Sequence, residues 1–343
     1  MSTRCVWLGV ALILAALAAV SAPSVAAISA EEILDETGIQ GGLIVHIGCG
    51  DGTLTAELRA SDSYMVHGLD ANPRNVAAAR EHVLAAGLYG QVAIDRIQGR
   101  QLPYIDNLVN LVVAETPGKI PASEFTRVLA PEGVAYVKRG GEWTKTVKPR
   151  PDNIDVWTHY MHDATGNAVA QDDVVAPLRH KQWVGSPRYG RHHDHMSSVS
   201  AMVTTGKRLI YVMDEGSRQS IQLPSDWKLI GRDAFNGTIL WKRDIPEWHT
   251  RLWPLKSGPV QLARRLVAVG ERVYVTLGLE APLTELDAAT GETIRTYEGT
   301  DGTEEIILAD GILYVVIDDE DTSQEPDFAA VADVRKEANE RAW

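Results

Sequence analysis

Cysteine is nearly absent from this chain, which has two among 343 residues. Cys5 lies just before an apolar N-terminal run, so a chain that loses that run keeps only Cys49. A single cysteine cannot form an internal disulfide, and the fold must therefore be held by buried apolar cores. A length of 343 residues is enough for two of them.

Runs of basic residues are also lacking, and the formal net charge is −13. An acidic surface of this kind repels phosphate backbones, so we expect no nucleic acid partner. The composition, 45% hydrophobic and 23% charged, excludes a disordered chain and is typical of globular domains.

Residues 1–27 have the pattern of a secretory signal peptide. Arg4 gives a positive start, Val6–Val20 is apolar and uncharged, and Val25 and Ala27 have the spacing of a cleavage site. We therefore expect export to the periplasm or the extracellular space. The alternative is an uncleaved anchor, because the apolar stretch is just long enough to span a bilayer, and only in that case is a membrane a partner.

Residues 31–145 alternate apolar strands with helical stretches, which predicts a doubly wound parallel sheet. The expected strands and helices are Leu43–Ile47, Thr53–Ala60, Met65–Leu69, a helix from Pro73 that ends before Gly87, Leu108–Ala114, Phe125–Leu129 and Val134–Lys138. Residues 146–154, which contain Pro149 and Pro151, are expected to be an exposed linker.

The sharpest motif is VHIGCGDGT, Val45–Thr53, where a strand runs into Gly48-x-Gly50-x-Gly52 and then a helix. Such a turn lets the backbone approach a ligand and directs free amides of the helix N-terminus at it. The third glycine of a dinucleotide GxGxxG motif would fall on Thr53. Asp70 ends the second predicted strand, where a carboxylate can accept hydrogen bonds from ribose hydroxyls.

These features resemble motif I and the acidic second-strand end of the class I S-adenosylmethionine (SAM) methyltransferases. Gly99–Glu115 and Glu124–Val137 are similar to the later strands of that family, so the resemblance covers about residues 31–140. It implies a Rossmann-like α/β fold with SAM as cofactor. The implied cofactor-binding residues are His46, Gly48, Cys49, Gly50, Gly52, Asp70, Ala71, Asn72, Arg100 and Glu115.

Several of these positions depart from the family pattern. His46 and Arg100 stand where the family usually has acids, and Asn110 stands where it has Asp. Glu115 begins Glu-Thr-Pro-Gly, which replaces the Asn-Pro-Pro-aromatic box of amino-group methylation. A domain that keeps the fold without the ligand therefore stays open. No catalytic residue can be named, since methyl transfer from a sulfonium often needs only proximity and alignment.

Residues 155–320 change to short β-branched runs separated by Gly, Asp and Asn. Trp227–Lys242 and Leu283–Arg295 share a strand, an Asp-Ala turn and a second strand, and glycine turns at Gly206, Gly270 and Gly311 open further strands. A repeated antiparallel meander of this period is typical of β-propeller blades.

The repeats resemble the pyrroloquinoline quinone (PQQ)-like family, with its Asp-Ala-x-x-Gly-x-x-x-Trp pattern completed once by Trp241. Trp157–Val169 looks like the lead-in to a first blade. The resemblance implies an all-β partial propeller that binds a protein or small-molecule partner. We do not expect PQQ itself, because most such repeats bind no cofactor and no vicinal cysteine pair is present.

The segment His192, His193, Asp194 and His195, with His159 and His162 elsewhere, contains metal-ligand residue types. Histidines that cluster in sequence often point in different directions, so we expect a polar loop and no metal site.

Residues 321–343 are expected to be a helical tail or insertion that ends mid-pattern, and only part of a propeller precedes them. We therefore expect an N-terminal piece of a longer protein that self-associates when alone. The apolar residues expected on its open face are Leu308, Leu313, Val315 and Ile317.

Three functions remain at this point. The first is an exported SAM-dependent methyltransferase whose propeller presents the substrate or a partner. The second is a non-catalytic exported scaffold with a degenerate methyltransferase-like domain. A quinone-dependent dehydrogenase is the third, and it needs blades that this chain lacks.

Overall fold

The computed structural model describes residues 28–174, 181–187, 190–191, 198–220, 223–249 and 260–317. Three sequence predictions lie outside these ranges: the leader over 1–27, the histidine cluster at 192–195 and the tail over 321–343. In the described part of the chain, no helix is long and apolar enough to cross a membrane.

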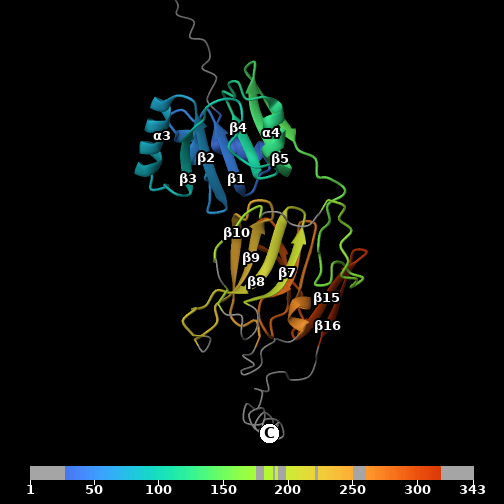
Figure 1. The fold of residues 1–343 in the computed structure, drawn as a ribbon. Coiled ribbons are helices and arrows are strands. Elements are labelled where there is room, and N and C mark those ends of the chain that lie inside the picture. The colour runs from blue at the N-terminus through green and yellow to red at the C-terminus, as the bar shows by residue number, and fades with distance from the viewer. Residues whose placement is uncertain are drawn as a thin grey trace, which may run out of the picture.

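The first region is one mixed sheet with helices on both faces, shown above the second region in Figure 1. Its strand order is β3-β2-β1-β4-β5-β6, in which β1 to β5 are parallel and β6 is antiparallel to β5. This confirms the expected parallel sheet. The elements are α1 (Ala30–Thr37), β1 (Gly42–Ile47), α2 (Thr53–Glu57), β2 (Tyr64–Asp70), α3 (Pro73–Ala85), β3 (Val92–Arg96), β4 (Val109–Ala114), α4 (Ala122–Val128), β5 (Leu129–Arg139) and β6 (Glu142–Val147).

The central strands β1 and β4 are buried along their whole length. One face of the sheet packs against α1, α2 and α3, and the other packs against α4. Burial on both faces explains why these strands are near-continuous apolar runs in the sequence.

Two strands, β3 and β6, were not anticipated individually. Both lie at the edges of the sheet, and most of their side chains reach solvent. They therefore lack the apolar runs that identify central strands. Because β6 ends at Val147, the first two residues of the expected linker belong to the sheet.

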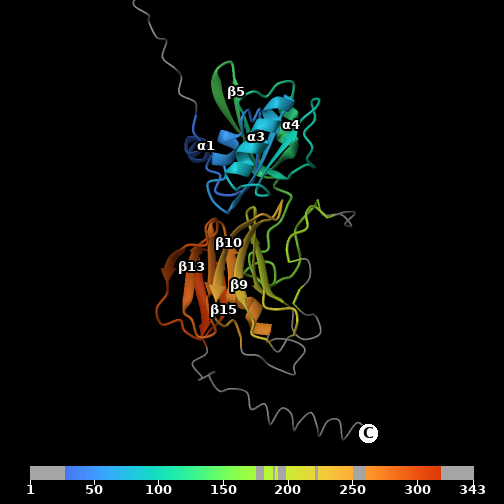
Figure 2. The same ribbon diagram turned by 90° about the vertical axis from the view of Figure 1, so that its left-hand side faces the viewer.

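The described residues of the second region form three antiparallel sheets that lie side by side (Figure 2). We call β7–β10 the first sheet, β11–β14 the second and β15–β16 the third. Their bounds are β7 (Val199–Thr205), β8 (Arg208–Asp214), β9 (Trp227–Asp233), β10 (Ile239–Ile245), a 3-10 helix η1 (Val260–Arg265), β11 (Leu266–Val269), β12 (Arg272–Thr276), β13 (Leu283–Asp287), β14 (Thr293–Thr296), β15 (Thr303–Ala309) and β16 (Ile312–Ile317).

The two Asp-Ala segments form the same turn. Asp233 and Asp287 each accept two backbone amides of their own turn through Oδ1. Their carbonyls accept the amides of Gly237 and Gly291, at 2.9 and 2.8 Å. The sequence repeat is therefore a structural repeat of two sheets.

The third sheet packs on the second sheet with the face that we expected to be exposed. Leu308, Leu313 and Val315 pack against the second sheet, so their predicted exposure was wrong. Side chains alternate between the two faces of a strand, and the sequence alone does not show which face is covered. The exposed residues on this sheet are Ile312 (54%), Tyr314 (52%), Val316 (51%) and Ile317 (42%).

A single segment is bonded to all three sheets. The Trp157 and Thr158 carbonyls accept the amides of Thr204 in β7 and Ala268 in β11, at 2.6 and 2.9 Å. The next residue, His159, accepts the Leu308 amide of β15 through Nε2 at 3.1 Å. Thr204, Ala268 and Leu308 are each the second-to-last residue of the first strand of a hairpin. The three bonds therefore involve equivalent positions in the three hairpins. The inner edges of the sheets therefore converge on one line.

The two regions meet at the amino ends of the parallel strands. Asn110, at the start of β4, is 1% exposed and accepts the Leu43 amide of β1 at 2.7 Å. Its Nδ2 donates to Asp233 at 2.6 Å, and its Oδ1 accepts from Asn236 at 2.6 Å. Ser63, just before β2, donates to the Leu240 carbonyl at 2.6 Å. The Asp-Ala turn of the first sheet is thus docked on the amino edge of the parallel sheet.

This contact also accounts for the amide at position 110. Burial raises the pKa of Asp233, which needs a donor and not a second carboxylate beside it. We expect Asn110→Asp to destabilise the protein by about 2–3 kcal/mol at neutral pH, and by less at acidic pH, where one carboxyl can hold a proton. Thermal unfolding at both pH values measures this. Asn153→Asp, at an exposed turn, is the matched control. Equal losses for both variants, or none, would contradict the role of Asn110.

Candidate functional site

The carboxyl end of β1 forms the glycine turn that the sequence predicted. Gly48, Gly50 and Gly52 have φ angles of +79°, +57° and +88°, in the left-handed region that favours glycine. A Cβ at Gly48 would lie 2.0 Å from Thr116 Oγ1, and one at Gly52 would lie 2.8 Å from Ala79. A Cβ at Gly50 would meet nothing within 4 Å. Two glycines therefore permit close packing, and the middle one faces open space.

Asp70 lies at the carboxyl end of β2, beside this turn, and is 7% exposed. Its Oδ2 accepts the Gly50 amide and Asn75 Nδ2, both at 3.1 Å, and its Oδ1 accepts the Asn72 amide at 2.7 Å. The carboxylate thus holds the glycine turn against the first turn of α3. A carboxylate has about four acceptor positions, so three bonds leave capacity for a further donor.

Ala71 and Asn72 follow Asp70 as expected and are exposed. Asn72 caps α3 by accepting the Arg74 amide at 3.0 Å, and the Ala71 carbonyl accepts Arg96 Nε at 3.3 Å. The two residues therefore have defined positions at the same edge as the glycine turn.

His46 differs from the expected cofactor contact. It is 3% exposed in β1, and its Nδ1 forms a 2.8 Å hydrogen bond with Thr55 of α2. Burial lowers its pKa from 6.5 to about 4, partly offset by the charges of Glu115 and Asp70. A neutral imidazole therefore fixes the helix that follows the glycine turn, behind the site.

Cys49 and Arg100 also make their contacts within the protein. Cys49 is buried, and its burial raises the pKa of the thiol to about 12, so the thiol does not ionise near neutral pH. Arg100 donates from Nε to the Lys119 carbonyl at 3.2 Å, which joins the loops after β3 and β4. Glu115, at the end of β4, forms a 2.8 Å ion pair with Lys138 of β5.

The structure therefore brings the glycine turn, Asp70, Ala71, Asn72 and Glu115 to the carboxyl edge of the sheet, whereas the buried His46 side chain bonds Thr55 of α2. Sequence reasoning missed Asn75 and Thr116. Asn75 lies three residues after the Asn72 cap, a spacing that turns both toward the same end of a helix. Thr116 directly follows Glu115, but its approach to Gly48 carries no sequence signal.

No metal centre is apparent in the described part of the chain, where no group of three or more His, Cys, Asp or Glu side chains is placed to hold an ion. His159 is bonded to Thr158 and to β15, and His162 forms a 2.8 Å bond with Asp155. The predicted polar loop at 192–195 lies outside the described residues.

Comparisons with known proteins agree with this geometry. Residues 44–133, less than half of the chain, match the family model of a methyltransferase domain. A comparison with curated proteins found no match. The chain thus carries a methyltransferase-like domain of Rossmann-like fold, followed by a region of antiparallel sheets.

Solved structures that match part of this chain include a candidate SAM-dependent methyltransferase from Methanococcus maripaludis (25% identity, 33% of this chain, 55% of that chain, TM-score 0.30). Others are a SAM-dependent methyltransferase from Aquifex aeolicus (22%, 32%, 66%, 0.29) and a geranyl diphosphate C-methyltransferase from Streptomyces coelicolor (18%, 32%, 43%, 0.30). The matched segment spans about half the length of the Methanococcus protein.

The buried His46 predicts a specific acid sensitivity. The unfolded chain binds a proton at this residue near its ordinary pKa of 6.5, whereas the folded chain does so only near 4. Stability is therefore lost as pH falls through this window, by about 2–3 kcal/mol from this group. His46→Asn, whose amide reaches about as far as Nδ1, should flatten the loss in chemical unfolding curves. His82→Gln, at an exposed helix position, should leave the curve unchanged. An unaltered pH slope in His46→Asn would contradict the assignment.

Proposed function

We propose that the first region binds SAM at the carboxyl edge of its sheet and transfers the methyl group to an acceptor. The observation that carries the proposal is the contact between Asp70 and the Gly50 amide, at the end of two adjacent parallel strands. The open space beside Gly50 and the remaining acceptor capacity of Asp70 fit a ligand with hydroxyl donors.

Each residue has a distinct part in this proposal. Gly48, Gly50 and Gly52 hold the methionine part, Asp70 accepts from the ribose hydroxyls, and Ala71 and Asn72 border the adenine. SAM supplies an activated methyl group when bound. The protein orients that group and excludes water, which is the larger part of catalysis in a reaction that depends on proximity and alignment.

The acceptor does not come from the antiparallel sheets in this proposal. Those sheets contact Ser63, Leu108 and Asn110, at the amino ends of β2 and β4. The glycine turn lies at the opposite edge of the same parallel sheet. An acceptor therefore reaches the site from the solvent side of the carboxyl edge, past the loops that contain Arg100 and Glu115.

For the second region we propose part of a PQQ-like β-propeller that serves as a platform for a protein or small-molecule partner. The repeated Asp-Ala turn and the convergence of three inner strands on Trp157–His159 support this. The proposal includes no quinone. The signal-peptide pattern in the sequence of residues 1–27 supports export, to the periplasm or the extracellular space.

A non-catalytic scaffold is the second candidate. Two observations favour it: His46 and Arg100 occupy positions that are acidic in SAM methyltransferases, and both make bonds within the protein. In this case the Asp70 network serves only to hold the glycine turn and α3 together.

Isothermal titration of the chain with SAM and S-adenosylhomocysteine separates the two candidates. If SAM binds, Asp70→Ala should weaken it by about tenfold or more, because charge-assisted hydrogen bonds are worth about 1.5–3 kcal/mol. His46→Ala should weaken it less, since His46 faces Thr55.

Asp51→Ala is the matched control, because Asp51 is an exposed carboxylate of the same turn that accepts the Thr53 amide at 3.0 Å. Equal losses in Asp70→Ala and Asp51→Ala would count against the ribose contact. An absence of binding heat with both ligands would leave the scaffold as the function.

A further inference from the structure

Trp241 shows how one sheet docks on the next. It lies in β10, the outermost strand of the first sheet, and its Nε1 donates to the Ala288 carbonyl of the second sheet at 3.0 Å. Its ring covers Gly291, where a Cβ would lie 2.5 Å from the indole. The tryptophan of one sheet therefore seats on the Asp-Ala turn of its neighbour.

Trp183 makes the same contacts with the first sheet. Its Nε1 donates to the Ala234 carbonyl at 2.8 Å, and a Cβ at Gly237 would lie 2.4 Å from its ring. Ala234 and Gly237 are the counterparts of Ala288 and Gly291 in the repeated turn. Residues 181–187 thus take the place of the outermost strand of a preceding sheet, yet they pair with no strand within the described ranges.

The faces of the sheets follow one rule. Ile210 and Val212 of β8 face the second sheet, and Tyr274 of β12 faces the third; we call these the front faces. Each front face packs on the back face of the next sheet, which carries Val273 and Val275 in the second sheet. The hairpin register aligns the back-face residues Leu209, Tyr211 and Met213 of β8 with Val273 and Val275 of β12 and with Leu313 and Val315 of β16.

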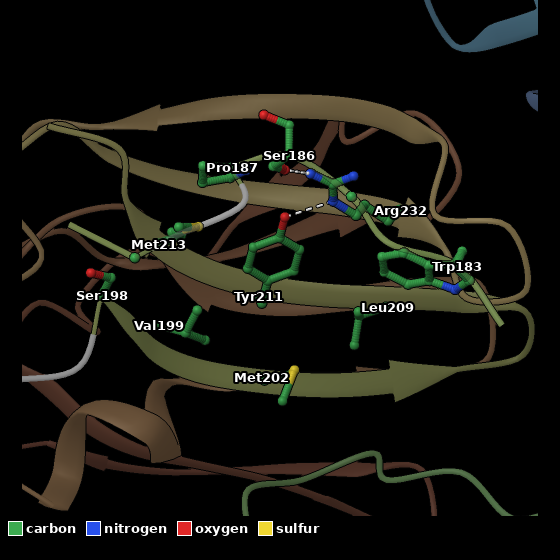
Figure 3. Close-up of a pocket in the computed structure, with 12 residues that line it drawn as sticks. Trp183, Ser186, Pro187, Ser198, Val199, Met202, Leu209, Tyr211, Met213 and Arg232 are labelled. Carbon is green, nitrogen blue, oxygen red and sulfur yellow. Dashed lines mark hydrogen bonds between the residues drawn. The ribbon is translucent and has the colours of Figure 1, made fainter. Parts of the chain in front are cut away.

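One back face and one front face lack a sheet partner in the described part of the chain. The back face of the first sheet borders a cavity of about 370 Å³, shown in Figure 3 with Trp183 at its rim. Its lining includes Leu209, Tyr211, Met213 and Met202, the last 55% exposed. The front face of the third sheet exposes Tyr314 and Val316, at 52% and 51%. Tyr314 is the counterpart of Tyr274, which is 9% exposed in its own interface.

We propose that this chain associates head to tail with a second copy of itself, the third sheet of one copy docking on the back face of the first sheet of the other. β15 and β16 of the second copy then take the position of the inner strands of a sheet that precedes the first sheet. Residues 181–187 of the first copy already take the position of the outermost strand of that sheet. Tyr314 enters the cavity beside Tyr211, as Tyr274 packs on Val315 within the chain. The two faces differ, so the contact is heterologous and builds either a closed ring or an open chain of copies.

Sedimentation velocity of the full chain over a range of micromolar concentrations tests this. The wild type should associate reversibly. Tyr314→Glu and Met202→Glu each place a charge on one of the two faces, at side chains exposed enough to leave the fold intact, and should weaken association by about tenfold or more. Met65→Glu, at a 48% exposed residue of β2, is the matched control and should behave as wild type.

A mixture of the two variants gives the decisive result. Each variant keeps one intact face, so together they should form a 1:1 dimer that does not extend. A wild-type monomer at all concentrations would overturn the proposal. So would association that persists in both single variants, or a mixture that stays monomeric. None of these outcomes depends on SAM binding.

Discussion

The hydrogen bonds of Asn110 are the contact on which the arrangement of the two regions depends. One buried amide accepts from the backbone of β1 and from Asn236, and it donates to Asp233. It therefore joins two central strands of the parallel sheet to a turn of the first antiparallel sheet. An isolated buried amide is costly, and here both the oxygen and the nitrogen of the side chain are hydrogen-bonded. An amide replaces the expected acid at position 110 because its partner, Asp233, is itself a carboxylate.

This docking assigns the two edges of the parallel sheet to different roles. The amino edge is occupied by the antiparallel region, and the carboxyl edge keeps the glycine turn and Asp70. Ligands of open α/β sheets bind outside the carboxyl ends of the strands, so the fused region leaves that edge accessible. Fusion and ligand binding are therefore compatible within one chain, although a partner held on the antiparallel sheets is remote from the glycine turn.

The sequence predicted the central strands, the glycine turn and Asp70, because these depend on local patterns such as apolar runs and GxGxG spacing. It did not predict β3 and β6, whose polar faces give no such pattern. The predicted exposure of Leu308, Leu313 and Val315 was wrong. Alternating side chains define two faces of a strand, and only the packing of the sheets determines which face is buried. The roles of His46 and Asn110 depend on Thr55 and Asp233, the latter 123 residues away, and no local pattern reveals partners at that distance.

The bonds from Trp157, Thr158 and His159 have a consequence for synthesis of the chain. These residues leave the ribosome before all three of their partners, and His159 waits for Leu308, 149 residues later. Contacts between residues so far apart in sequence form slowly, because a long loop must close first. The parallel domain, with mostly earlier partners, can fold as a unit during translation. The Trp157–His159 segment cannot complete its hydrogen bonds until the third hairpin has been synthesised. During that interval the apolar residues of the antiparallel region are most exposed to contact with other chains.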